Sequence, residues 1–199
     1  MAFSTRCFRN VLLKLAALLL AAVVFTPALA DGGIKPINGS AEYAGDHIEL
    51  AARFTVNFNG TLEDALANGL SLPFIYEFQL TKPRIYSWYR QISDGFGPAA
   101  TLTYRLSYHS LSRQYRLNLG NFYRSFPNLD EALSALGVVR GWNVLAGSSV
   151  ARDKSEFSGK IRLKLDLSQL PKPFQLSTIG QSDWKLESSW IDVDGEPAQ

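Results

Sequence analysis

Apolar residues occupy every second position through several segments of this chain, and this period of two constrains its fold more than any other feature. Successive side chains of a β-strand point to opposite faces of a sheet, so one face of each segment is expected to be buried and the other solvated. The clearest segment predicts a half-buried strand over residues 48–58. Its alternating apolar residues are Ile48, Leu50, Ala52, Phe54, Val56 and Phe58.

The same pattern predicts further strands, separated by turn-forming residues. Residues 101–119 are expected to form a hairpin, and Asp94-Gly95 with Gly97-Pro98 gives a strong turn signal before it. Pro83 is expected to end the preceding strand or to restrict it to a sheet edge. After a loose entry and first strand over residues 31–45, the predicted strands cover residues 72–81, 101–109, 114–119, 138–144, 160–167 and 183–193.

Two short helices are expected between these strands. Thr61 is the predicted N-cap of the first, which stops near Gly69, and Asn128 is the predicted N-cap of the second, which ends at Gly137. Acidic residues in the first turn of each favour a helix because they interact well with the helix dipole. The chain is therefore predicted to be mainly β (α+β), as an antiparallel β-sandwich or a strongly twisted sheet with two short helices.

The first 30 residues have the three-part layout of a secretory signal peptide. Three basic residues precede an unbroken apolar run from Leu15 to Phe25, and Ala28 and Ala30 supply small residues before Asp31. The run has 11 residues, whereas a helix needs about 20 to cross a bilayer. We expect cleavage after Ala30, no stable membrane span afterwards, and a single β-rich periplasmic domain over residues 31–199; an uncleaved signal anchor is the alternative.

Cleavage would remove Cys7, the only cysteine, so the mature chain could form no disulfide and would depend on its hydrophobic core. It would also remove 3 of the 20 basic residues and none of the 18 acids. The distribution of charge is uneven, because residues 82–124 carry seven basic residues and one acid, Asp94. This asymmetry predicts one positively charged surface.

A Tyr-Arg dipeptide occurs four times in that basic region, at Tyr89-Arg90, Tyr104-Arg105, Tyr115-Arg116 and Tyr123-Arg124. Neighbours in a strand point to opposite faces, so the tyrosines are expected in the core and the arginines outside. The predicted binding residues are Arg105, Arg116, Arg124 and His109, sharing one sheet face.

Such a face could receive an anionic polymer, a lipid head group or an acidic partner surface. The commoner outcome is an ordinary solvated face, on which arginine serves solubility and edge protection. Nucleic acid is a poor candidate partner because the protein is expected to be exported and its mature form lacks net positive charge.

Most sequence signatures of catalysis are missing. The two histidines, His47 and His109, stand at polar strand positions without the spacing of a metal site. The chain has no Gly-x-Ser-x-Gly elbow, no Walker A loop and no Gly-x-Gly-x-x-Gly fingerprint. We therefore predict no catalytic, metal or cofactor residues, although a pair of carboxylates for glycoside hydrolysis needs no sequence spacing and stays open.

The leader, the segments Leu70 to Phe74 and Leu170 to Leu176, and Asp183 to Leu186 with Trp190 near the end together form a recognisable set. With them the chain resembles a family of short exported proteobacterial proteins of unknown function, sometimes labelled proline-rich signal peptide proteins. The resemblance implies no assigned activity and no catalytic residues to carry over. Genes of the family often neighbour a membrane sensor kinase of the nitrogen-regulation type, which implies an accessory role by association.

We expect a non-enzymatic binding or accessory protein of the cell envelope. It would dock through the predicted face of Arg105, Arg116, Arg124 and His109 to an envelope or inner-membrane protein, such as the periplasmic part of a sensor kinase. One alternative is a cell-wall glycan hydrolase with two carboxylates, which would show a cleft holding two acids, one with a raised pKa. Another is a structural subunit that presents residues 72–81 as an edge strand to a partner chain. Ligand identity and oligomeric state are not predictable from the sequence.

Overall fold

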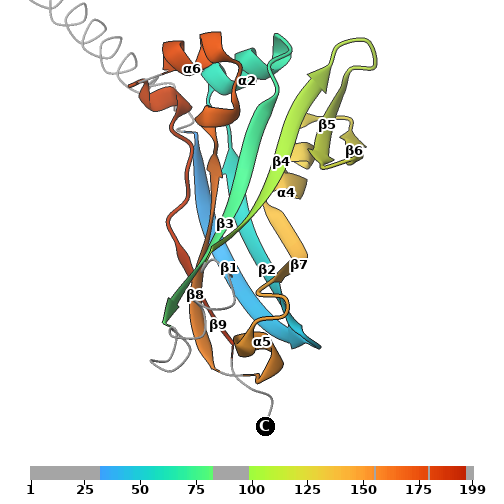
Figure 1. The fold of residues 1–199 in the computed structure, drawn as a ribbon. Coiled ribbons are helices and arrows are strands. Elements are labelled where there is room, and N and C mark those ends of the chain that lie inside the picture. Colours follow the sequence, from blue (N-terminus) through green and yellow to red (C-terminus); the bar gives the residue numbers. More distant parts are fainter. Residues whose placement is uncertain (1–31, 83–98, 155, 179, 196–199) are drawn as a thin grey trace, which may run out of the picture. The chain divides into compact units, whose positions relative to one another are not determined.

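A computed structural model of the protein describes residues 32–82, 99–154, 156–178 and 180–195. Within these residues antiparallel strands build a three-stranded and a six-stranded sheet (Figure 1). The predicted mainly β fold, with two antiparallel sheets and short helices, is confirmed. The predicted leader, the turn signals between residues 83 and 98, and the Tyr89-Arg90 pair lie outside the described residues.

The smaller sheet has the order β1 (Gly33–Ala44), β2 (His47–Asn57) and β7 (Val138–Val144). β2 is its central strand, and Gly45 at φ +66° turns the chain from β1 into β2. Every apolar residue of the predicted alternation over 48–58 is buried. The period of two therefore identified both this strand and its core face.

The larger sheet has the order β6 (Phe122–Phe126), β5 (Gln114–Leu119), β4 (Ala99–His109), β3 (Leu72–Lys82), β8 (Phe157–Leu165) and β9 (Ile191–Gly195). The predicted hairpin over 101–119 is confirmed by the pairing of β4 with β5. Of the two expectations for Pro83, the end of the strand agrees with the structure, since β3 stops at Lys82. The alternative that residues 72–81 form an edge strand is wrong, because β3 pairs with β4 on one side and β8 on the other. Both backbone edges of β3 are already occupied, so it cannot accept a partner chain.

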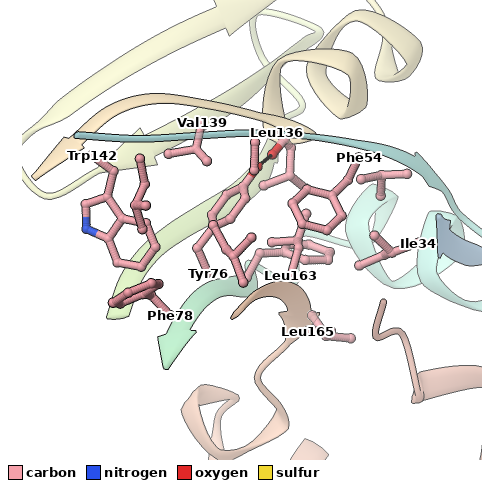
Figure 2. Packing of buried hydrophobic residues seen from close by; sticks show 14 of the residues in the cluster. Ile34, Phe54, Tyr76, Phe78, Leu136, Val139, Trp142, Leu163 and Leu165 are labelled. Atoms are coloured by element: carbon pink, nitrogen blue, oxygen red, sulfur yellow. Dashed lines mark hydrogen bonds between the residues drawn. The ribbon is translucent and has the colours of Figure 1, made fainter. Parts of the chain in front are cut away.

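The inner faces of the two sheets meet in one hydrophobic cluster (Figure 2). Tyr76 of β3 is central to it, with its ring 5.8 Å from that of Phe54 and 6.5 Å from that of Trp142, both in the smaller sheet. Its hydroxyl donates a hydrogen bond to the backbone carbonyl of Leu136. Burial, with a smaller contribution from Tyr104, raises the pKa of Tyr76, so the phenol stays neutral.

Two capped helices connect strands. Asn128 caps α4 (Leu129–Leu136) as predicted, since its Oδ1 accepts a hydrogen bond from the N–H of Glu131 at 2.8 Å. The predicted cap of α2 (Gly60–Ala67) is wrong by two residues. Asn59 rather than Thr61 takes the extended cap conformation, and its Oδ1 accepts from the N–H of Leu62 at 3.0 Å. The helix cap therefore lies two residues earlier than predicted, because the side chain of Asn59 rather than that of Thr61 caps the helix.

The predicted strand over residues 183–193 is only partly present. Its first part is the turn η2 (Ser182–Trp184), followed by an extended segment, and regular pairing begins at β9. The alternation in this segment reflects burial against β8, because the carbonyl of Leu186 accepts from Leu165 and Ser188 donates to Leu163. Short helical turns at α5 (Ser149–Arg152), η1 (Leu167–Gln169) and α6 (Lys172–Thr178) were not predicted.

The first and last described strands also meet. Tyr43 of β1 donates a hydrogen bond to the carbonyl of Gly195 in β9 at 3.3 Å. A Cβ placed on Gly39 would lie 2.7 Å from Val193, so glycine permits β1 to approach β9 closely at this point. The two sheets are thus joined along one side by packing between their outermost strands.

Candidate functional site

The candidate site is the outer face of β4, β5 and β6, the face that points away from the smaller sheet. Strand pairing places Arg105 opposite Asn118, and Asn118 opposite Tyr123. In the next rows, Ser107, Arg116 and Ser125 lie side by side, and His109 lies opposite Gln114. Cross-strand partners share a face, so Arg105, Arg116 and His109 do lie together as predicted.

Arg116 is the best-defined cation of this face. Its Nη1 lies 3.2 Å from His109 Nε2, and its guanidinium carbon lies 5.1 Å from the centre of the Tyr123 ring. Its Nε is buried and has no hydrogen-bond partner within the described part of the chain. The tyrosine ring and the histidine therefore fix the position of a guanidinium group that is not neutralised.

Arg105 lies toward the centre of the sheet on the same face. Its Nη2 donates a hydrogen bond to Oε1 of Gln169 at 2.9 Å, and Gln169 belongs to η1 near the C-terminal part of the chain. Gln169 was not identified from the sequence, because nothing local signals a contact between residues 64 positions apart. Over the described ranges neither Arg105 nor Arg116 forms an ion pair.

Arg124 is not part of this face, which corrects the prediction. It lies opposite Leu117, whose side chain is buried, and its guanidinium packs over the ring of Phe126 at 5.4 Å on the inner side. The reason is the β5–β6 turn at Gly120 and Asn121, where Gly120 has φ +57°. A two-residue hairpin turn with glycine first fixes the register and so places Tyr123, not Arg124, on the outer face.

The tyrosines of the Tyr-Arg pairs divide accordingly. Tyr104 and Tyr115 are partly buried against the core, as predicted, and burial raises the pKa of each. Tyr123 is 60% exposed, contrary to the prediction. Its ring instead supports Arg116. In β5 the tyrosine of the pair faces the core and the arginine faces outward, whereas in β6 the tyrosine faces outward and the arginine faces the inner side.

An ion-pair network covers the neighbouring part of the same outer face, over β3 and β8. Oε2 of Glu77 is 2.6 Å from Nε of Arg162, and its Oε1 is 2.7 Å from Nζ of Lys164. Glu187 adds longer contacts to Arg162 at 3.7 Å and to Lys185 at 3.3 Å. This network was not predicted from the sequence, because it depends on which strands pair.

Among the described residues, two carboxyl groups have shifted pKa values, Glu77 in β3 and Asp166 directly after β8, and both pKa values are lowered. Burial raises the pKa of Glu77, but hydrogen bonds from Lys164 and Arg162 and their charges outweigh it. Burial likewise raises the pKa of Asp166, and hydrogen bonds from Ser168 and Gln169 outweigh it. A general acid of a glycosidase needs a raised pKa, so neither group has the displacement that this role requires.

The arginine face differs from this network in having no carboxylate of its own. Eleven positions of β4, β5 and β6 point outward in the paired register, and none is Asp or Glu. We call this set the arginine face. Its members are Ala99, Thr101, Thr103, Arg105, Ser107, His109, Gln114, Arg116, Asn118, Tyr123 and Ser125.

Three surface hollows lined by described residues contain few acidic side chains. One of about 430 Å³ lies between β2 and α4 and holds a single carboxylate, Asp130. A second of about 200 Å³ and a third of about 190 Å³ hold none. Among the described residues no three His, Cys, Asp or Glu side chains are placed to hold a metal ion. In that same set no helix has the length and apolar character needed to span a bilayer.

Comparison with known proteins gives one match. A family model described as a domain of unknown function, DUF4390, covers residues 34–194, from within β1 to within β9. This agrees with the expected resemblance to a family without an assigned activity. No curated protein and no solved structure matches the chain.

Proposed function

The chain belongs to the DUF4390 family of domains of unknown function, and from its geometry we propose that it is a non-enzymatic binding protein whose arginine face holds an anionic group of a partner. The observation that carries this proposal is a pair of guanidinium groups, Arg105 and Arg116, on a face without a carboxylate. A guanidinium presents several N–H donors in a planar fork that matches carboxylate and phosphate oxygens. The ligand supplies the negative charge that the face lacks.

The surroundings of Arg116 support this role. Stacking on Tyr123 and the contact with His109 hold the side chain in one position, which lowers the entropy lost on binding. By contrast, Arg162 and Lys164 on the same sheet are occupied by Glu77 and are not available to a ligand. Two outward cations of β8 are thus paired with an acid, whereas Arg105 and Arg116 are not.

The place of action is the cell envelope. Residues 1–30 act as an export signal that is cleaved after Ala30, and residues 31–199 act as one domain in the periplasm. The partner is an acidic surface of an envelope or inner-membrane protein, and the periplasmic part of a membrane sensor kinase is the specific candidate. The signal-like leader and the resemblance of the sequence support this assignment.

The first test measures binding of the purified exported protein to an acidic peptide by isothermal titration calorimetry at two salt concentrations. The double variant Arg105→Glu/Arg116→Glu should lose binding, and the wild-type affinity should fall as salt rises because the contact is ionic. Arg140→Glu is the matched control, since Arg140 is exposed on β7 of the other sheet. Equal affinity of the double variant and the wild type would disprove the proposal.

The second test identifies the partner in cells. Crosslinking of the tagged exported protein, followed by mass spectrometry, should recover an envelope protein from wild type and from the Arg140→Glu control. The double variant should not recover it, provided that cell fractionation confirms its export and circular dichroism of the purified variant confirms its folding. Recovery of the same protein by all three would place the docking surface elsewhere.

A further inference from the structure

β6 is an outer strand of the larger sheet, and it is unusually exposed. It pairs only with β5 among the described strands, and four of its five residues are exposed, including Phe122 at 82% and Tyr123 at 60%. Figure 1 shows β5 and β6 at one end of the larger sheet, beyond β4. Sheet edges are normally shielded by charge, proline or a covering element, so an edge rich in exposed aromatic rings suits the addition of another strand.

The register identifies the backbone groups at that edge. Leu119 and Phe122 flank a two-residue turn, and such a flanking pair exchanges hydrogen bonds. Pairs then alternate, so Leu117 with Arg124 is bonded in the same way, while the N–H and C=O groups of Tyr123 and Ser125 point away from β5. Those four groups are the donors and acceptors that an added strand would meet.

A hollow lies beside this edge on the inner side. It has a volume of about 190 Å³ and joins the inner side of β5 and β6 to the end of α4 and the start of β7. Its lining is mainly apolar, with Arg124 as the charged member. The remaining residues include Leu117, Leu119, Phe122, Ala135 and Val138. Side chains of a strand added to β6 would point alternately into this hollow and toward the arginine face.

We propose that the β6 edge binds an extended segment of a partner protein as a seventh strand of the larger sheet. The segment alternates apolar side chains, which enter the hollow, with acidic side chains, which face Arg116. This inference rests on the proposed function, because it specifies the form in which the acidic partner binds. Main-chain hydrogen bonds to Tyr123 and Ser125 supply affinity, and the alternating side chains supply specificity.

Charge favours this occupant over a second copy of the chain. β6 carries Arg124 and no acid. Antiparallel pairing of two β6 edges about their centre would place Arg124 opposite the same residue of the other copy, with Arg116 one strand away on each side. Like charges directly opposite each other destabilise a strand pair. The partner segment places an apolar side chain rather than an arginine beside Arg124, and its acidic side chains gain ionic contacts with Arg116 on the other face.

The test uses a fluorescent eight-residue peptide that alternates valine and glutamate, with the full exported protein. Two further peptides carry N-methyl groups on all valines or on all glutamates. Only one of these sets of N–H groups can face β6, since N–H direction alternates along a strand. We expect one methylation pattern to weaken binding by about tenfold or more and the other to have little effect, and exchange of the Tyr123 and Ser125 amides to slow by about tenfold with the parent peptide.

A protein variant tests the same contact from the other side. Ser125→Pro removes an N–H that points to the open edge and spares the pairing with β5, whereas Ser125→Ala retains the N–H and serves as the control. The proline variant should lose peptide binding and the alanine variant should keep it. If the proline variant does not fold, the methylated peptides still decide the question with the wild-type protein.

The outcomes separate the two proposals. Unmethylated and both methylated peptides binding equally, with loss of binding in Arg105→Glu/Arg116→Glu, would overturn strand addition and leave the arginine face as the site. No binding of any acidic peptide would overturn both. Slowed exchange at Tyr123 and Ser125 that depends on protein concentration without peptide would show self-association and overturn the peptide as occupant.

Discussion

The hydroxyl of Tyr76, in the middle of the larger sheet, donates a hydrogen bond to the carbonyl of Leu136, the last residue of α4. A carbonyl in the final turn of a helix has no N–H partner within the helix, so the tyrosine satisfies a group that the core would otherwise leave unpaired. The same residue thereby connects a β3 side chain to the helix that joins β6 to β7.

Tyr76→Phe should therefore destabilise the protein with almost no change in packing volume. Removing one partner of a buried hydrogen bond costs about 1–3 kcal/mol because the other partner stays desolvated. Urea unfolding followed by tryptophan fluorescence measures the loss, with Tyr108→Phe as a control at a less buried tyrosine. Equal unfolding midpoints for Tyr76→Phe and wild type would mean that water replaces the lost donor.

Glu77 should make stability depend on pH. Its pKa is lowered in the folded protein, so its contribution is present above the ordinary carboxyl pKa of 4.5 and is lost as pH falls through the lowered folded value. Glu77→Gln should lower the free energy of unfolding at pH 7 by about 1–2 kcal/mol, and the difference from wild type should shrink in acid.

Glu187→Gln is the control for that experiment. The side chain of Glu187 is 40% exposed, against 17% for Glu77, and its contacts are longer. Its substitution should cost less than about 1 kcal/mol. Urea titrations from pH 3 to pH 7 compare the two variants. A Glu77→Gln deficit that is constant over this range would rule out titration of the carboxylate as its source.

The two arginines of neighbouring strands should differ in binding. Arg116→Gln should weaken binding of an acidic peptide by about tenfold, which corresponds to about 1.4 kcal/mol. Arg124→Gln should have a much smaller effect, because Arg124 lies on the inner side over Phe126. Fluorescence anisotropy titrations measure both affinities. A larger effect at Arg124 than at Arg116 would contradict the assignment of the arginine face.

The start of α2 can be tested by substitution. Asn59→Ala should cost about 1 kcal/mol of stability because it removes the acceptor for the N–H of Leu62. It also removes the 2.8 Å hydrogen bond from Asn59 Nδ2 to the carbonyl of Asp183. Thr61→Ala should cost less, since the exposed Thr61 hydroxyl makes only a 3.3 Å contact with Asp183. Thermal unfolding gives both values, and the reverse order would restore Thr61 as the cap.

Local patterns predicted much of this fold. The alternation in β2 identified a strand and its buried face because one face of the sheet is buried in the core and the other is exposed to solvent. Asn128 and Gly137 marked the limits of α4 because cap residues act within one turn of the chain. These features depend on residues that are close together in the sequence, so a single sequence is enough to predict them.

Strand order and pairing register could not be predicted in the same way. The central position of β3 depends on β8, about 80 residues later in the chain, so Pro83 could indicate where the strand ends but not whether it lies at an edge. The face of Arg124 depends on a turn of two residues, and reading Gly120-Asn121 as a hairpin turn would have corrected it. The arginine face was thus partly predictable, while Gln169 and the Glu77 network were not.

The meeting of β1 with β9 bears on how the chain folds. The contact between Tyr43 and Gly195 joins residues 152 positions apart, so its formation carries a large loop-closure entropy. Folds rich in such non-local contacts reach their native state slowly, and the last strand must be available before the first can be covered. Until the final segment is available, the side of β1 that meets β9 stays uncovered, which makes that interval the period in which a chaperone or a protease could act on the chain.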